Sequence, residues 1–136
     1  MGYDLSNAHK RCVELGLSST FRDKGRLEVN LGHDIVLCFQ NAESDEDCLI
    51  GFEDTPWHAH DEIMFSDAHG NFIVMNYLEI LDGLADGRLL VCEVRKNGIL
   101  SDRWLIHQDC NNEFKYMHPD EEIRVVRPTT NKVNHL

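Results

Sequence analysis

The stretch that decides the fold is Leu89-Leu-Val-Cys-Glu-Val-Arg-Lys-Asn97-Gly98-Ile-Leu-Ser-Asp-Arg-Trp-Leu-Ile-His107. Asn-Gly readily supplies the two consecutive residues of positive φ that a type I′ turn requires. Apolar and β-branched residues are frequent on both sides of this dipeptide, as they are in strands. The stretch therefore predicts a β-hairpin with strands over 89–96 and 99–107.

A two-residue loop also fixes which side chains of this hairpin lie opposite each other. In the tight register Glu93 faces Asp102, and a like-charge cross-strand pair is unfavourable by a few tenths of a kcal/mol or more. We expect the neighbouring Arg95 and Arg103 to neutralise these carboxylates. The same register puts Trp104 on the face of Leu89, Val91 and Ile106, which predicts that this tryptophan fills the core.

Alternating apolar residues predict further strands on either side of this hairpin. Strands over 27–31 and 35–39 flank Gly32-His33, which we interpret as a two-residue turn. A strand is also expected over 48–52 and another over 122–126, the latter ended by Pro128. Two short strands, 63–65 and 72–75, are separated by the turn-rich stretch 66–71.

Two amphipathic helices complete the prediction. Residues 4–15 have apolar side chains at helical spacing, with Asp4 or Ser6 as the N-cap and Gly16 at the C-terminal end. Residues 77–86 follow Asn76, which caps the helix, and Glu79 stands at the capping-box position. Helices among strands joined by tight turns predict an α+β fold with a mainly antiparallel sheet.

The length of 136 residues predicts one domain, which we place at residues 1–128 and follow with a flexible C-terminal tail at 129–136. No segment approaches the roughly 20 apolar residues that span a bilayer, so we expect a soluble protein. The N-terminus lacks the features of a signal peptide, which makes the cytoplasm the expected location. The sequence leaves the oligomeric state open.

Five widely spaced cysteines without a Cys-x-x-Cys pair predict reduced, mostly buried thiols. Cys110 is the exception, because it stands in the polar run 107–112, and we expect it to be exposed in a turn. No Gly-x-Ser-x-Gly, phosphate-binding glycine loop or His-Glu-x-x-His is present. The sequence therefore favours a protein without catalytic residues or cofactors, and leans away from an enzyme.

Charge is segregated along the chain. The formal net charge is −11, yet residues 27–87 contain 14 Asp and Glu and not one Lys or Arg. Such a segment, folded onto one face, repels nucleic acid and anionic membranes and attracts a basic protein. The alternative is an acidic surface that only aids solubility. The residues predicted to bind the partner are Glu43, Asp45, Glu46, Asp47, Glu53, Asp54, Trp57, Asp61 and Glu62.

The stretch Thr55-Pro-Trp-His-Ala-His-Asp-Glu62 permits a different function. In an extended segment His58 and His60 share one face, where a carboxylate completes a 2-His-1-carboxylate metal site. A helical turn beginning at Pro56 instead separates the two imidazoles by about 200°. The alternative function is thus a small metal-binding protein or metal-dependent enzyme, with ligands drawn from His58, His60, Glu62, Asp67 and His69.

Two resemblances accompany these patterns. Gly51, His58, His60 and Gly70 look like the first motif of the cupins, although the first spacing is one residue too long, Met64 or Phe65 replaces the expected glutamate, and no second motif follows. A small, acidic, single-domain α+β protein without catalytic motifs also resembles the bacterial immunity proteins that neutralise toxins. That resemblance implies a role, the covering of a basic active site by an acidic surface, and assigns no residue.

Overall fold

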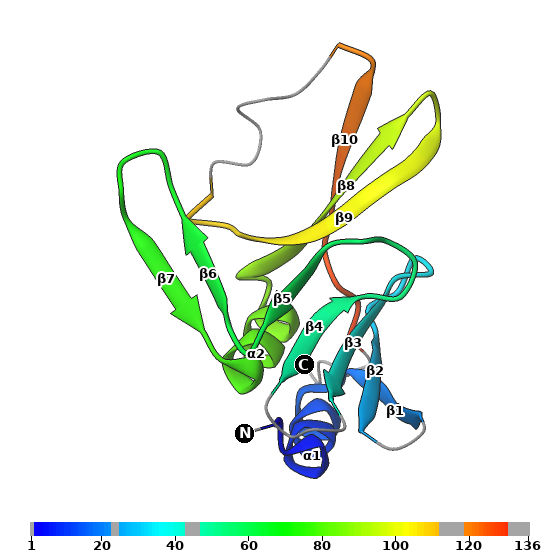
Figure 1. The fold of residues 1–136 in the computed structure, drawn as a ribbon, viewed down its shortest axis with the longest axis vertical. Helices are drawn as coiled ribbons and strands as arrows, with labels where there is room; N and C mark the ends of the chain where they lie inside the picture. Colours follow the sequence, from blue (N-terminus) through cyan, green and yellow to red (C-terminus); the bar gives the residue numbers. More distant parts are fainter. Residues whose placement is uncertain (1, 23–24, 43–46, 112–118, 131–136) are drawn as a thin grey trace, which may run out of the picture.

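A computed structural model describes residues 2–22, 25–42, 47–111 and 119–130. Its largest sheet is antiparallel and follows chain order, so that each strand pairs with the next one along the sequence. Figure 1 shows this sheet beside the N-terminal helix. The strands are β1 (Ser18–Arg22), β2 (Arg26–Asn30), β3 (Val36–Asn41), β4 (Cys48–Phe52) and β5 (His58–His60).

Two smaller antiparallel sheets follow. In the first, β6 (Ile63–Ser66) pairs with β7 (Phe72–Met75), as predicted. In the second, β8 (Leu89–Lys96) lies between β9 (Ile99–His107) and β10 (Glu121–Val126). All strand pairs of the described residues are antiparallel, which confirms the predicted α+β class.

Helix 77–86 has the predicted bounds, and the first helix begins at Leu5, after Asp4, which is one of the two N-caps that the sequence allowed. Helix α1 (Leu5–Leu15) is capped by the Asp4 side chain and ends at Gly16, whose φ of 79° is left-handed. Helix α2 (Tyr77–Asp86) has the complete capping box between Asn76 and Glu79. The helices pack against each other, α1 also against β1 and β2, and α2 also against β7 and β8.

The hairpin at 89–107 forms, but its register corrects the predicted charge pair. Asn97 and Gly98 have φ values of 53° and 80°, as a type I′ turn requires. A β-bulge then moves the partner of Val94 to Asp102 while Arg95 faces Leu100. Because the bulge shifts every later pair by one residue, Glu93 lies opposite Arg103, and the expected Glu93–Asp102 pair was wrong.

The same shift moves Trp104. It lies opposite Cys92, so Leu89 and Val91 are on the other face of the hairpin, contrary to prediction. Trp104 is only partly buried and does not belong to the hydrophobic core cluster. One inserted residue has therefore turned a predicted core tryptophan toward the surface.

Two other local predictions were incomplete. Strand β1 was missed because its side chains are mostly exposed and do not alternate, so its backbone pairing with β2 defines it. The turn between β2 and β3 is longer than Gly32-His33. Its positive-φ residues include Gly32, His33 and Asp34, and the Ile35 N–H donates to the Gly32 carbonyl.

One hydrophobic core joins the helices and the sheets. Its largest fully buried side chains include Phe39 of β3, Ile50 of β4, Leu81 of α2 and Val91 of β8. Near the C-terminus, the Thr129 N–H donates to the Leu31 carbonyl, while residues 131–136 lie outside the described part. The core therefore ties elements from the beginning, middle and end of the chain together.

Candidate functional site

Strand β5 carries the two histidines that the sequence singled out. The segment is extended and pairs with β4, so the predicted alternative of a helical turn at Pro56 was wrong. His58 and His60 share an exposed face, and their ring centroids are 5.2 Å apart. One ring nitrogen of each already has a partner: Nδ1 of His58 lies 3.1 Å from the Pro56 carbonyl, and Nδ1 of His60 lies 2.9 Å from Asp47.

Two of the other proposed metal ligands, Asp67 and His69, lie in the β6–β7 turn, whereas Glu62 lies just after β5. Asp67 organises the β6–β7 turn, where its carboxylate accepts hydrogen bonds from the N–H groups of His69 and Asn71. The Asn71 side chain donates a third hydrogen bond to this carboxylate. The three bonds, of which this one has the largest effect, lower the pKa of Asp67 below its ordinary 3.8. Within the described residues no three His, Cys, Asp or Glu side chains form a group that could hold a metal ion.

Acidic residues stand at both ends of the β4–β5 hairpin. Asp47 and Asp61 lie at one end, where the Asp61 N–H donates to the Cys48 carbonyl, and Glu53 and Asp54 lie at the other end. The hydrogen bond with His60 is the largest cause that lowers the pKa of Asp47 below 3.8. We call Asp47, Glu53, Asp61 and Glu62 the acidic patch.

Asp61 is held in place from two sides. Its carboxylate accepts a hydrogen bond from the Cys48 thiol at 2.7 Å, and its backbone carbonyl accepts one from the Tyr3 hydroxyl at 2.9 Å. Burial, followed by the bond to Asp61, raises the pKa of Cys48. The turn after β5 is therefore fixed to the N-terminus of the chain, with the Asp61 backbone at a φ of 61°.

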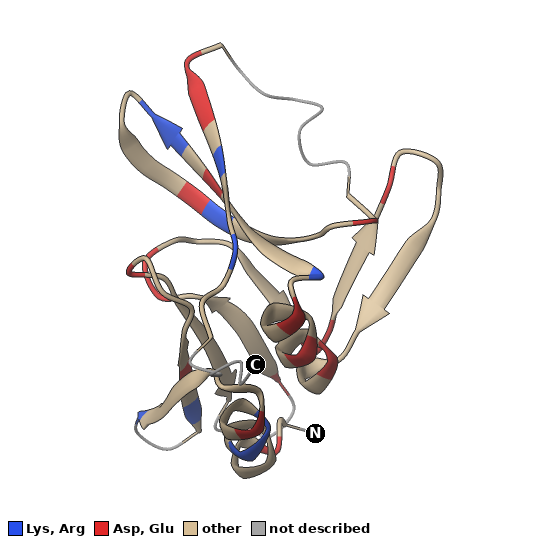
Figure 2. Ribbon diagram, turned by 180° about the vertical axis from the view of Figure 1, so that it is seen from behind, with Lys and Arg blue, Asp and Glu red and all other residues tan. Residues whose placement is uncertain are grey.

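The acidic patch forms few ion pairs within the described part of the chain, although the charge of Arg26 acts on Glu53. Within the described residues, Glu53, Asp61 and Glu62 form no ion pair with Lys or Arg, and Asp47 pairs with His60 alone. Figure 2 shows Lys and Arg mainly on the β8–β10 sheet, β1, β2 and α1. Glu43, Asp45 and Glu46 lie outside the described part of the chain.

Asp54 is not part of the acidic patch, because Arg103 neutralises its charge. Both of its oxygens accept from Nη1 of Arg103, at 2.5 and 2.6 Å, and Nε of Arg103 donates to Glu93 at 2.7 Å. Burial lowers the pKa of Arg103, but the hydrogen bonds to Asp54 and Glu93 outweigh this effect and raise the pKa above its ordinary value. The expected neutralisation is thus confirmed for Glu93, by Arg103. By binding Asp54 as well, the Arg103 side chain clamps the β4–β5 loop onto β9.

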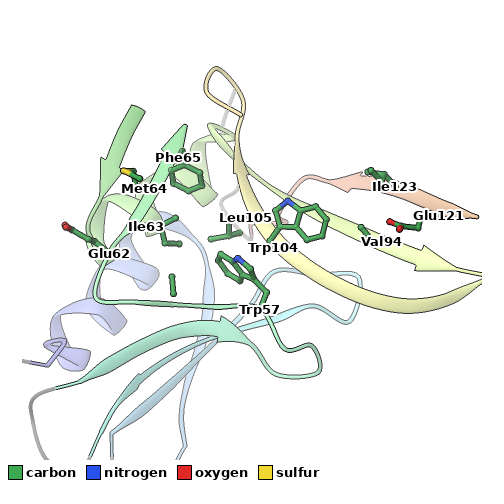
Figure 3. A pocket seen from close by; sticks show the side chains of 11 residues that line it. Trp57, Glu62, Ile63, Met64, Phe65, Val94, Trp104, Leu105, Glu121 and Ile123 are labelled. Carbon is green, nitrogen blue, oxygen red and sulfur yellow. The ribbon is translucent and has the colours of Figure 1, made fainter. Parts of the chain in front are cut away.

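Beside the acidic patch lies a groove of about 520 Å³. Figure 3 shows Trp57, Ile63 and Leu105 at its base, Met64 on the β6 side, and Val94 and Ile123 on the β8–β10 side. The Trp57 ring packs on Phe52 with centroids 5.7 Å apart, and its backbone N–H donates to Asp102 at 3.3 Å. The loop clamped by Arg103 therefore also positions the tryptophan of the groove.

Sequence reasoning assigned these groove residues to strands and missed the groove. The available signal was the run of consecutive apolar residues in 63–65 and 72–75. Both faces of that hairpin are apolar, yet only one face can meet the core. The outer face leaves Met64, Phe72 and Val74 exposed, at 65%, 65% and 41%.

A second pocket, of about 250 Å³, lies on the other side of Trp57 and is lined by Arg26, Cys38, Thr55 and His58 among others. Arg26 donates to the Cys38 sulfur at 3.0 Å, but burial dominates and raises the pKa of that thiol. A thiol with a raised pKa is a poor nucleophile at neutral pH. This pocket therefore offers no activated group.

The cysteines are buried, and no disulfide links them. Cys110 was expected to be exposed but is only 3% exposed, because its thiol lies 3.4 Å from the Phe65 carbonyl at the β6–β7 hairpin. Burial raises its pKa, so this turn does not present a reactive thiolate. The polar residues next to Cys110 in the sequence suggested an exposed thiol, but packing against the β6–β7 hairpin buries it.

Comparison with protein-family models, curated proteins and solved structures gives no significant match for this chain. Among the described residues, neither helix has the length and apolar character needed to cross a membrane. The candidate site therefore rests on its own geometry: an exposed edge strand, a set of carboxylates around it, and an adjoining apolar groove.

Proposed function

We propose that this protein is a non-catalytic binding protein whose acidic patch binds a basic partner protein. The observation that carries the proposal is the set of carboxylates at the two ends of β5 that form no ion pair with Lys or Arg in the described residues. An ion pair formed within the chain leaves little charge for a partner, whereas Asp61 and Glu62 have no such pair in the described residues and Glu53 has only the nearby charge of Arg26.

The composition around the patch favours a protein over nucleic acid or an anionic membrane as the partner. Between Leu27 and Gly87 every fixed side-chain charge is negative. Such a field raises the association rate of a basic protein and opposes the approach of phosphate groups. An immunity-type role, in which this surface covers a basic active site of a toxin, fits the same chemistry.

Co-purification at low ionic strength from the native cell identifies the partner, and stopped-flow mixing then tests the patch. We expect an association rate that falls steeply with added salt. Glu53→Gln, Asp61→Asn and Glu62→Gln together should slow association more than they speed dissociation. Glu43, Asp45, Glu46 and Asp47 remain predicted contributors, and the matching amide variants test them separately.

A matched control changes the same net charge away from the patch. Glu14, Asp109 and Glu122 are exposed and lie outside the acidic segment, and Glu14→Gln, Asp109→Asn and Glu122→Gln together also remove three carboxylates. We expect this triple variant to alter the association rate much less than the patch variant does. Equal effects of the two triple variants, or a partner that binds independently of salt, would reduce the acidic segment to a solubilising surface.

The alternative, a metal-binding protein, is favoured by one observation. His58 and His60 project from the same exposed face of β5 with ring centroids 5.2 Å apart. Two imidazoles on one face are a common start of a site for zinc or a similar metal. Elemental analysis of the purified protein decides between the two functions, because a metal site requires near one ion per chain.

A further inference from the structure

The groove beside the acidic patch combines an apolar base with negative walls. Trp57, Ile63 and Leu105 form its base, and Glu62 and Glu121 stand on opposite sides of it (Figure 3). Among the described residues that line it, none is Lys or Arg. The base of the groove therefore suits an apolar side chain of a bound segment. The residues before and after that side chain would lie near carboxylates, which favours cationic residues there.

The groove also continues onto exposed apolar surface. Met64 belongs both to its wall and to the outer face of the β6–β7 hairpin, where Phe72 and Val74 are exposed as well. Contiguous exposed apolar surface beside a groove is typical of interaction sites. Tryptophan is moreover the residue most enriched among those that carry binding energy at protein interfaces.

One polar group of the groove lacks a partner. The indole N–H of Trp104 is buried and makes no hydrogen bond within the described residues. This nitrogen has less than 1 Å² of exposed surface, so it lies beneath the surface of the groove and a docked segment does not contact it. The base that the groove offers to a ligand is therefore apolar.

From these observations we infer that the groove binds a segment of the partner protein in which a large apolar side chain is flanked by Lys or Arg. The apolar side chain occupies the space above Trp57, and the flanking cations lie against Glu62 and the neighbouring carboxylates of the acidic patch. This inference rests on the proposed function, since it names the part of the basic partner that the protein recognises. It adds a requirement that charge alone does not impose, namely the apolar anchor.

Four five-residue peptide amides separate the effect of the apolar anchor from the effect of the charge. The first has a central phenylalanine with two lysines on each side, the second a central alanine with the same lysines. The third and fourth carry phenylalanine or alanine between serines. Trp57 and Trp104 are the only tryptophans of the chain and both line the groove, so intrinsic fluorescence reports binding there directly.

We expect the lysine–phenylalanine peptide to bind at least about tenfold more tightly than each of the other three. Met64→Lys and Ile123→Lys should each weaken its binding by at least about tenfold, because they put a cation on the groove wall. Val13→Lys is the matched control. Val13 is 65% exposed on α1, the substitution adds the same charge, and affinity should change less than about twofold.

The other outcomes overturn the inference in distinguishable ways. If the two lysine peptides bind equally and the groove variants have no effect, the apolar anchor is wrong while the acidic binding function stands. If the serine–phenylalanine peptide binds as tightly as the lysine–phenylalanine one, the groove is apolar only and the charge argument fails. A dimer in sedimentation that Met64→Lys dissociates would assign the groove to a second copy of the chain, and absence of binding by all four peptides would also refute the inference.

Discussion

Replacing Arg103 by methionine should be the most destabilising of the single changes considered for the site. Arg103 is 4% exposed, and its Nε donates to Glu93, itself 3% exposed. Methionine removes the cation but fills a similar volume, so Glu93 is left as a buried carboxylate without its partner. Breaking a buried ion pair from one side costs about 3–5 kcal/mol.

The second half of the clamp contributes less. The Asp54 side chain is 51% exposed, so water takes over much of its interaction when the pair is broken. An exposed ion pair typically contributes about 0.2–1 kcal/mol. Asp54→Asn should therefore cost about 1 kcal/mol or less, and the difference between the two variants measures the burial of Glu93.

Urea denaturation of Arg103→Met, followed by circular dichroism, gives the change in the free energy of unfolding. Arg22→Met is the matched control, because Arg22 forms an exposed ion pair with Glu28 and has a side chain that is 62% exposed. Adding Glu93→Gln to Arg103→Met should recover about 1–3 kcal/mol, since it removes the stranded charge. A loss below about 1 kcal/mol in Arg103→Met, or one equal to that of Arg22→Met, would refute the reasoning.

The remaining predictions concern the turn, the histidines and Asp47. Gly98→Ala should destabilise the protein by about 1–2 kcal/mol, because Gly98 has a φ of 80° and a Cβ there meets no atom within 4 Å, so the cost is that of the left-handed backbone; thermal unfolding measures it. His58→Ala with His60→Ala should change stability by less than about 1 kcal/mol, as expected for exposed side chains, and elemental analysis should find no stoichiometric metal in either protein. Near one metal ion per chain, lost in the double variant, would instead support the metal site. His60→Gln should raise the pKa of Asp47 toward 3.8, as NMR titration would show. A lowered carboxyl pKa stabilises the fold above the unfolded-state value and this stabilisation is lost as the pH falls through the folded-state value, so the variant should lose less stability below pH 3.8 than the wild type does.

Several elements were predictable because their determinants lie within a few residues of one another. The Asn97-Gly98 turn, the Asn76–Glu79 capping box and the glycine that ends α1 each act through neighbouring backbone groups. The acidic segment and the His58-x-His60 pair were likewise visible as patterns. The geometry of the turn and the helix caps can be predicted from the sequence, since turn and cap chemistry depends on local φ and ψ.

The geometry of the candidate site depended on contacts between distant residues. Arg103 binds Asp54, which lies 49 positions earlier in the sequence, and the Cys110 thiol contacts the carbonyl of Phe65, 45 positions earlier. No local sequence pattern predicts such contacts, because they form only when the sheets pack together. The groove is of the same kind, since its walls come from strands that are separate along the chain.

The bulge beside Val94 shows most directly where sequence reasoning ends. From the sequence alone, the type of turn at Asn97-Gly98 was determined, and with it the existence of the hairpin. Whether Glu93 faces Asp102 or Arg103, and whether Trp104 points into the core or toward the groove, was decided by one extra residue in β9. That residue is accommodated because it places Arg103 between two carboxylates, and only the tertiary structure brings Asp54 close enough to be the second of them.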